Sequence, residues 1–236
     1  MHAPWPKPQR YDGLWVIGHR GAAGLAPENT LASFSQAVRL GVDAVELDVH
    51  LSADERLLVI HDADVERTTN GRGKVATTTF AALRRLDAGD GERIPTLDEV
   101  LEAVPTRIAV NIELKGRGTA APVARAVTGC TRPLLVSAFD HAELARFRDL
   151  CPDIPCAPLL AEWRRGVLDT ARALDAWSVN LADGIAGTAT VNAVRESGRL
   201  CLVYTVNDAE RAAALRAMGV AGVFGDFPDR LLKPAR

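Results

Sequence analysis

The stretch LWVIGHRGAAGLAPENTLASFSQAVRLG, residues 14–41, contains one complete strand–helix unit. Its first five residues, LWVIG, are apolar and end on a glycine, which predicts a buried strand. The segment ENTLASFSQAVRLG, residues 28–41, predicts a helix, because Leu31, Phe34 and Val38 recur at helical spacing and a glycine follows as a stop signal. The rest of the chain repeats this pattern.

Strand and helix patterns alternate to the end of the sequence. Further strands are predicted at 42–49, 107–115, 134–139, 156–160, 177–182, 199–207 and 220–226. Further helices are predicted at 96–104, 121–129, 140–150, 164–174, 188–198 and 208–219. Such alternation favours a parallel sheet with right-handed crossovers. Eight strand–helix units in 236 residues therefore predict an α/β fold of the TIM (β/α)8 barrel type.

One segment interrupts the alternation. LLVIH, residues 57–61, has the composition of a strand, and residues 62–95 after it are irregular and rich in threonine, glycine and charge. This segment lies between the second strand and its helix, and we expect it to be too short for a core of its own. The sequence thus predicts one TIM-barrel catalytic domain over residues 1–236, with an inserted flap over one barrel end at about 62–95.

Composition and charge exclude several classes of protein. The chain is 47% hydrophobic and 25% charged, and its net charge of −2 gives no overall field that would attract nucleic acid or an anionic membrane. No apolar run approaches the roughly 20 residues of a membrane-spanning helix, and the first residues lack the apolar region of a secretion signal. The four scattered cysteines favour reduced thiols. We expect a cytoplasmic protein with no stable membrane association and no nucleic-acid partner, and its oligomeric state stays open.

Two predicted strands carry charged residues on a single face. Side chains alternate along a strand, so Glu46 and Asp48 share one face of VELDV while the aliphatic residues share the other. In VNIELK, Glu113 and Lys115 share a face in the same way. Because helices cover the outside of a barrel, the aliphatic faces are expected to point outward. The charged residues are then expected inside the barrel near its C-terminal mouth, where active sites of this fold lie.

The carboxylates of Glu46, Asp48 and Glu113 would repel one another in an enclosed place and raise each other's pKa values. A divalent cation relieves that repulsion, and oxygen ligands favour a hard ion, Mg²⁺ or Ca²⁺. The alternative is a lattice of ion pairs in which Arg20 and Lys115 neutralise the carboxylates. The carboxylates alone leave both interpretations open.

Two of the five histidines stand in comparable places. His19 follows the first strand, beside Arg20, and His61 follows the aliphatic run after the second strand. An unperturbed imidazole pKa of about 6.5 lets one ring accept a proton and the other donate one near neutral pH. Together with a cation, an arginine and a lysine, two such rings indicate a site for an anionic phosphoryl group.

Several motifs, taken in order, resemble those of the glycerophosphodiester phosphodiesterase family. They are HRGAAGLAPENTLASF (19–34), GVDAVELDVHLSADERLLVIHDADVERTTNGRGKV (41–75), IPTLDEVL (94–101) and NIELKG (111–116), with looser agreement in SAFD (137–140), YTVN (204–207) and GVFGDFP (222–228). The resemblance is to the short cytosolic bacterial type. It implies a TIM barrel with a small insertion after the second strand. It also implies metal-dependent hydrolysis of glycerophosphodiesters to glycerol 3-phosphate and an alcohol.

The resemblance further implies a role for each motif residue. It implies that His19 and His61 act as general acid and base. It implies that the metal is bound by Glu46, Asp48 and Glu113, and that the phosphate is held by Arg20 and Lys115. The metal would be Mg²⁺ or Ca²⁺. Two routes stay open: attack on phosphorus by a substrate glycerol hydroxyl, which forms a cyclic phosphate, and direct attack by water. The identity of the alcohol stays open as well.

Two positions depart from the family pattern. The family usually has tryptophan where Tyr204 stands and threonine where Gly225 stands. We expect Tyr204 and Phe139 to form an apolar wall for the substrate, so the tyrosine would alter substrate preference. Gly225 is expected only to loosen the end of the last strand.

Three further residues of these motifs have two interpretations each. Glu28 and Asn29 could contact a ligand, but the pattern favours the start of the first helix, with Asn29 or Thr30 near its cap. His50 could extend the face of Asp48 as an extra ligand or as a partner of one, but we expect it at a solvent-facing end of the second strand.

Two other functions fit parts of the pattern. A barrel that binds a phosphorylated ligand without reaction would be expected to have lost a histidine or a carboxylate, and none is missing. A lysophospholipid-cleaving phosphodiesterase of the same fold would have a broad apolar entrance, whereas Phe80 is the only aromatic residue of the insertion. A small water-soluble glycerophosphodiester is therefore the expected substrate.

Overall fold

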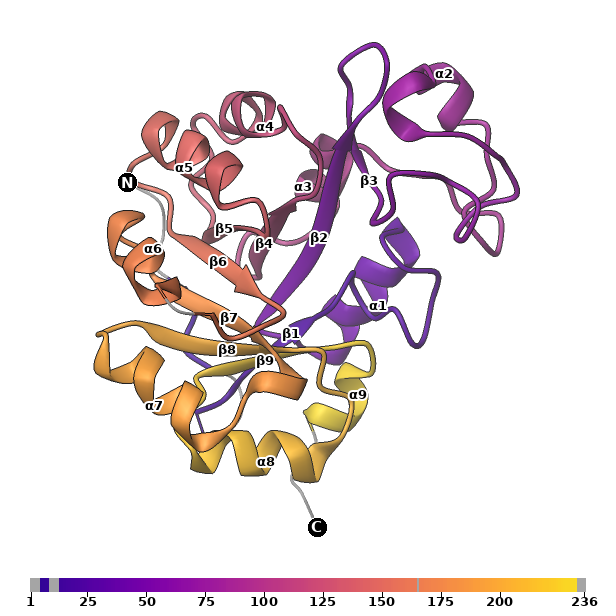
Figure 1. Cartoon of the computed structure of the whole chain (residues 1–236). Coiled ribbons are helices and arrows are strands. Elements are labelled where there is room, and N and C mark those ends of the chain that lie inside the picture. The colour runs from indigo at the N-terminus through magenta and orange to yellow at the C-terminus, as the bar shows by residue number, and fades with distance from the viewer. Residues whose placement is uncertain (1–4, 9–12, 165, 233–236) are drawn as a thin grey trace.

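A computed structural model describes residues 5–8, 13–164 and 166–232 of the chain. Figure 1 shows its strands gathered in the middle of the molecule with helices around them. The strands are β1 (Trp15–Gly18), β2 (Ala44–Leu51), β3 (Leu57–Val59), β4 (Ala109–Leu114), β5 (Leu134–Ala138), β6 (Cys156–Leu160), β7 (Ser178–Ala182), β8 (Leu200–Tyr204) and β9 (Gly222–Gly225).

Eight of these strands form a closed parallel barrel. Neighbours are hydrogen-bonded in the order β1-β9-β8-β7-β6-β5-β4-β2, and β1 also pairs with β2, which closes the sheet on itself. The predicted TIM barrel is therefore confirmed. β3 pairs antiparallel with β2 outside the barrel, so the apolar run at 57–61 is the excursion that the sequence indicated.

The helices cover the outside of the barrel. They are α1 (Leu31–Leu40), α2 (Phe80–Leu83), α3 (Leu97–Ala103), α4 (Ala120–Ala126), α5 (His141–Leu150), α6 (Val167–Ala173), α7 (Thr188–Glu196), α8 (Ala209–Ala217) and α9 (Pro228–Leu231), with 3-10 turns at Val75–Thr77 and Asp183–Ile185. Within the described ranges, no helix has both the length and the apolar character needed to cross a membrane.

The first helix begins three residues later than its sequence pattern suggests. Thr30 is its N-cap, and the Thr30 hydroxyl accepts a hydrogen bond from the Ser33 N–H at 3.2 Å. The expected cap at Thr30 is confirmed. The assignment of Glu28 and Asn29 to the helix start alone is wrong, because both side chains engage the charged groups at the barrel mouth.

Side chains alternate between two apolar layers, as the sequence predicted. Val45, Leu47 and Ile112 are fully buried in the layer between the strands and the helices. A second cluster fills the inside of the barrel and includes Ala44 and Phe224. Glu46 and Asp48 lie between these inward residues and the C-terminal mouth, because β2 presents every second side chain to the inside.

The insertion at 62–95 packs around a small apolar cluster that it shares with the β3 segment. The cluster consists of Leu58, Ile60, Val65, Val75, Leu83, Ala88 and Ile94. Leu58 and Ile60 lie outside the insertion, so the segment does not form this core from its own residues alone. In Figure 1 the insertion, with α2, projects beyond the ring of helices beside β2.

Gly225, at the end of the last strand, is tightly packed rather than loose. A Cβ atom added there would lie 2.3 Å from the Leu231 Cδ1 atom and 2.5 Å from the Val206 carbonyl oxygen. The prediction that Gly225 only loosens the strand end is therefore wrong. The backbone of the chain after β8 occupies the space that a larger residue would need.

Three tryptophans close the end of the barrel opposite the mouth. The rings of Trp5, Trp15 and Trp177 lie 5.1–5.6 Å apart between centroids. The Trp15 Nε1 atom donates to the Pro6 carbonyl oxygen at 2.7 Å, and that of Trp5 donates to the Leu134 carbonyl oxygen at 3.3 Å. These contacts attach residues 5–8 to the base of the barrel.

We predict that Trp15→Ala lowers the free energy of unfolding by about 2–4 kcal/mol, because it removes a large aromatic group from this cluster. Equilibrium urea unfolding measures the change. Trp163→Ala is the matched control: that ring is exposed on the β6–α6 loop, so its loss should change stability by no more than about 0.5 kcal/mol. Equal destabilisation by the two variants would contradict the role of the cluster.

Candidate active site

Three buried carboxylates meet inside the barrel below its mouth. Glu46 and Asp48 come from β2 and Glu113 from β4, and Asp48 is paired with Glu113 in the register of these parallel strands. One oxygen from each group can be chosen so that the three lie within 4.8 Å of one another. The side chains predicted to bind a metal are thus brought together.

Each carboxylate has a donor on one side. The Arg20 N–H donates to Glu46 Oε2, the Asn29 amide donates to Asp48 Oδ2, and the Lys115 ammonium donates to Glu113 Oε1, all at 2.8 Å. Arg20 adopts a left-handed φ of 50°, which few non-glycine residues do. These contacts fix the orientation of the three groups.

Two buried carboxylate oxygens, Glu46 Oε1 and Asp48 Oδ1, accept no hydrogen bond from any residue that the structure describes. The Lys115 Nζ atom lies 3.6 Å from Asp48 Oδ1, an ion-pair distance that is too long for a hydrogen bond. Buried polar atoms normally have a partner, and these two belong to the group of three convergent carboxylates. Hard oxygen donors in this number suit a divalent cation, so the residues present fit such an ion.

Burial and mutual repulsion perturb the acidity of the three groups. Burial, followed by the negative charge of Asp48, raises the pKa of Glu46 well above its usual range and that of Glu113 to about 7. Burial acts in the same direction on Asp48, but Lys115 and Arg20 outweigh it and lower the pKa of that carboxyl. Asp48 is therefore ionised at neutral pH, while its neighbours hold protons more tightly.

His61 lies at the mouth between an acid and a lysine. Its Nδ1 atom is 2.6 Å from Asp62 Oδ1, and its Nε2 atom is 3.0 Å from the Lys115 Nζ atom. Burial is the main cause of a lowered pKa for this ring, which therefore favours the neutral imidazole. The His50 Nε2 atom lies 3.0 Å from the His61 carbonyl oxygen, so the expectation of a solvent-facing His50 is wrong.

His19 has a carboxylate partner of its own. Its Nδ1 atom is 2.6 Å from Asp226 Oδ1, which follows β9. Asn207 holds the other side of that acid, because its amide donates to Asp226 Oδ2 at 2.8 Å and its oxygen accepts from the Asp226 N–H at 2.7 Å. Burial opposes ionisation of Asp226, but the hydrogen bonds from His19 and Asn207 outweigh it and lower the pKa.

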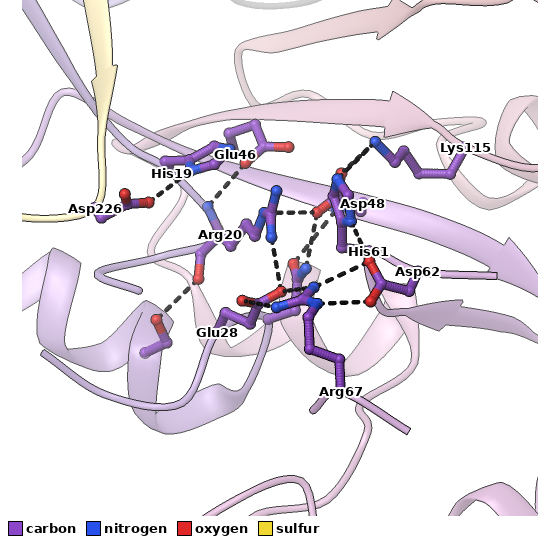
Figure 2. A network of polar contacts seen from close by, with 12 residues as sticks. His19, Arg20, Glu28, Glu46, Asp48, His61, Asp62, Arg67, Lys115 and Asp226 are labelled. Carbon is purple, nitrogen blue, oxygen red and sulfur yellow. Dashed lines mark hydrogen bonds and ion pairs between the residues drawn. The ribbon is translucent and has the colours of Figure 1, made fainter. Parts of the chain in front are cut away.

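A charged network connects Arg20, the residue after His19, with His61 (Figure 2). The Arg20 guanidinium donates to Glu28 at 2.8 Å and its Nε atom lies 3.5 Å from Asp48. Arg67, which comes from the insertion, donates two hydrogen bonds to Glu28 and two to Asp62. The figure shows Arg20 with the acids on both sides of it and Arg67 below them. Arg67 thus links the acid beside Arg20 with the acid beside His61.

Phe139 and Tyr204 lie at one side of the mouth. Their rings meet edge to face with centroids 6.0 Å apart, and the Lys115 ammonium is 5.6 Å from the centroid of the Phe139 ring. Phe139 is 46% exposed, which argues against a role in core packing. The Tyr204 hydroxyl is buried and lacks a hydrogen-bond partner among the described residues. Both rings therefore stand where a bound molecule would contact them.

Sequence reasoning missed the partners of the predicted residues. Asp62 had a local signal, because it directly follows His61. Glu28 and Asn29 lie in the PENT motif, residues 27–30, whose residue types favour a helix start. Asp226 gave no signal toward His19 other than its place at the end of a strand.

The barrel mouth has two cationic side chains that suit an anion and three carboxylates that suit a cation. This combination is typical of (β/α)8 enzymes that act on phosphate esters. Comparison with known proteins makes this more specific. Residues 19–230 match the model of the glycerophosphoryl diester phosphodiesterase family. The chain is 34% identical to a glycerophosphodiester phosphodiesterase of Bacillus altitudinis, over 92% of this chain and 96% of that protein. It is 32% identical to one of Caldanaerobacter subterraneus subsp. tengcongensis, over 94% and 97%.

Solved structures agree with these relatives. An Oleispira antarctica phosphodiesterase in complex with the product sn-glycerol-3-phosphate is 32% identical, with a TM-score of 0.88 over 92% of this chain and 94% of that one. The chain belongs to the glycerophosphoryl diester phosphodiesterase family. Its activity is the hydrolysis of glycerophosphodiesters to glycerol 3-phosphate and an alcohol.

The pKa values of the carboxylates predict how stability depends on pH without metal. Because the folded-state pKa of Glu113 is about 7 and its ordinary value is 4.5, the folded state loses stability as pH rises through that interval. A bound cation removes the repulsion. We predict that saturating Mg²⁺ or Ca²⁺ raises the Tm by about 5–10 °C at pH 8 and by less at pH 5.5, measured by thermal unfolding against EDTA.

The control for this measurement is Glu113→Gln, which keeps the shape of the side chain and removes its charge. Its Tm without metal should fall less between pH 5.5 and pH 8 than that of the unmodified chain, and its response to cation should be reduced. A cation response of equal size at both pH values, or one retained in full by the variant, would contradict metal binding at these carboxylates.

Arg67 gives a second prediction. Arg67→Leu removes four hydrogen bonds that hold Glu28 and Asp62, so we expect kcat/KM for a glycerophosphodiester to fall by about 10–100-fold. Arg72→Leu is the matched control, because that arginine is exposed on the same insertion. Steady-state kinetics that are the same for both variants would show that the insertion arginine does not position the site.

Proposed function

We propose that His19 and His61 are the acid–base pair with which this chain hydrolyses glycerophosphodiesters, and that Glu46, Asp48 and Glu113 hold the divalent cation. The observation that carries the proposal is that both imidazoles stand at one barrel mouth, each held at Nδ1 by a carboxylate 2.6 Å away. An orienting carboxylate fixes the ring and directs Nε2 toward the reacting groups. In His61 that nitrogen lies 3.0 Å from the Lys115 Nζ atom, so substrate would have to replace this contact before Nε2 accepts a proton.

The diester phosphate would lie between the cationic side chains. Arg20 and Lys115 carry positive charge at the mouth. Burial acts to lower the pKa of each, but the neighbouring acids outweigh it and raise both pKa values, so both side chains stay charged. Each can donate to a non-bridging oxygen, where charge develops during phosphoryl transfer. When bound, a divalent cation supplies further neutralisation of that charge. Both Mg²⁺ and Ca²⁺ suit the oxygen donors, and we propose one of the two.

We assign His61 as the general base. Its lowered pKa keeps the imidazole neutral near pH 7, so its Nε2 can remove the proton of the attacking hydroxyl. As the new oxygen–phosphorus bond forms, the bond from phosphorus to the alcohol oxygen breaks. We assign His19 as the general acid that delivers a proton to that leaving oxygen. With water as the nucleophile, this step gives glycerol 3-phosphate directly. With a substrate glycerol hydroxyl it gives a cyclic phosphate, which water then opens: one histidine accepts the proton of the water, a ring P–O bond breaks, and the other histidine protonates the glycerol oxygen.

The insertion takes part in this arrangement without contacting the phosphate. Asp62 holds His61 and Glu28 holds Arg20, and Arg67 ties the two acids together. The hydrogen bonds of Arg67 are the main cause of a lowered pKa for Asp62, which therefore stays ionised beside the imidazole. A protonated His61, formed after the first transfer, is stabilised by that charge.

We further propose that the substrate is a small glycerophosphodiester in the cytoplasm rather than a lysophospholipid. Phe139 is an exposed aromatic side chain at the mouth, but the cations and acids around it favour a polar ligand. The described cysteines are unpaired, which suits a reducing compartment.

Release of glycerol 3-phosphate from sn-glycero-3-phosphocholine tests the proposal. We expect release with Mg²⁺ or Ca²⁺, loss of activity with EDTA, and a decrease in kcat of at least about 10²–10⁴-fold in His19→Ala and in His61→Ala. Both variants should keep the cation-dependent rise in Tm, since neither histidine is assigned to the metal. Near-normal turnover by either variant would exclude that histidine as a catalyst.

A further inference from the structure

A groove of about 440 Å³ opens beside the active site, between the loops that follow β5 and β6. Apolar residues that line it include Leu159, Leu160, Ala161 and Val167. Its polar lining residues are His141, Thr170, Glu162 and Arg164. A volume of this size lies in the range of small-molecule pockets.

The groove borders the catalytic site and shares a lining residue with it. Phe139 forms part of its wall and is the same ring that contacts Tyr204 and faces the Lys115 ammonium. Leu159 lines the groove and also lines the small space between His19, Glu46 and Glu113. A molecule whose phosphate lies beside Lys115 can therefore extend past Phe139 into the groove.

The charges of the groove do not favour an ionic occupant. Glu162 is the single acid among its lining residues that the structure describes, and it is held by Arg164 through two hydrogen bonds at 2.6 and 3.0 Å. The Phe139 ring already faces the ammonium of Lys115. A cationic head group would have to compete for both partners, and an anionic one would meet a neutralised arginine.

Hydroxyl groups suit the groove better. The Glu162–Arg164 pair offers an acceptor beside a donor, which neighbouring hydroxyls can use without separating the ions. Thr170 adds a hydroxyl that both donates and accepts, while Phe139 and the aliphatic lining residues can pack against C–H groups. A ring or chain that carries several hydroxyls on an aliphatic skeleton has this combination of surfaces.

We propose that this groove binds the alcohol portion of the diester, and that it selects an uncharged polyhydroxylated alcohol of the size of a cyclitol. The proposal rests on the proposed function, because the alcohol can reach the groove only if the phosphate occupies the site beside Lys115. Selection acts on binding of the diester and leaves the proton transfers unchanged.

Three diesters that differ only in the alcohol test the proposal: sn-glycero-3-phosphoinositol, sn-glycero-3-phosphocholine and the methyl ester of glycerol 3-phosphate. We expect kcat/KM to be highest for the inositol ester. Thr170→Phe should lower kcat/KM for the inositol ester at least tenfold more than for the methyl ester, mainly through KM. Glu162→Gln should reduce the preference for inositol over methanol.

The matched control is Thr106→Phe, which adds the same ring at an exposed position in the loop before β4, at the other end of the barrel. It should leave the ratio between esters unchanged. The groove assignment would be overturned if all three esters release glycerol 3-phosphate and the ratios of kcat/KM between them are the same in the unmodified chain and in Thr170→Phe. The proposed function would then still stand. A preference for the choline ester would overturn the assignment to an uncharged alcohol. Release from none of the esters would instead contradict the proposed function.

Discussion

Burial of three carboxylates in one place is the constraint on which the rest of the site depends. Inside the barrel, ionised Glu46, Asp48 and Glu113 are poorly solvated and repel one another, so opposite charge must be fixed around them. Arg20 and Lys115 supply part of that charge. Two carboxylate oxygens, Glu46 Oε1 and Asp48 Oδ1, accept no hydrogen bond from the described residues, and a divalent cation could supply further positive charge there. The same positive charge is what an anionic phosphate would encounter at the mouth.

The barrel and the insertion divide the work of building this site. Parallel pairing of β2 with β4 sets Asp48 opposite Glu113, so the geometry of the acids follows directly from strand register. The insertion, which shares a small apolar core with β3, carries Arg67 to the acids beside Arg20 and His61. A rigid sheet thus positions the proposed cation ligands, while a loop segment orients the proposed phosphate-binding and proton-transfer groups.

Sequence reasoning succeeded where the controlling rule is local. Alternation along a strand is enough to put Glu46 and Asp48 on the inner face, and repeated strand–helix units are enough to predict the barrel. It failed where a contact depends on how distant strands pair. Asp226 reaches His19 across 207 positions only because β9 pairs with β1. His50 is held against the backbone after β3, a contact that depends on the antiparallel return of β3 along β2. Likewise, no local pattern shows that the insertion shares its core with β3.

We propose that the buried carboxylates bind a single divalent cation, and this binding can be measured directly. Calorimetric titration of Mg²⁺ or Ca²⁺ at pH 6.5, in two buffers that differ in ionisation enthalpy, measures both binding and the protons released with it. Because burial raises the pKa of Glu46 and of Glu113, we predict binding of one ion per chain accompanied by proton release, and its loss in Glu113→Gln. Binding without proton release, or with the same affinity in the variant, would contradict the claim.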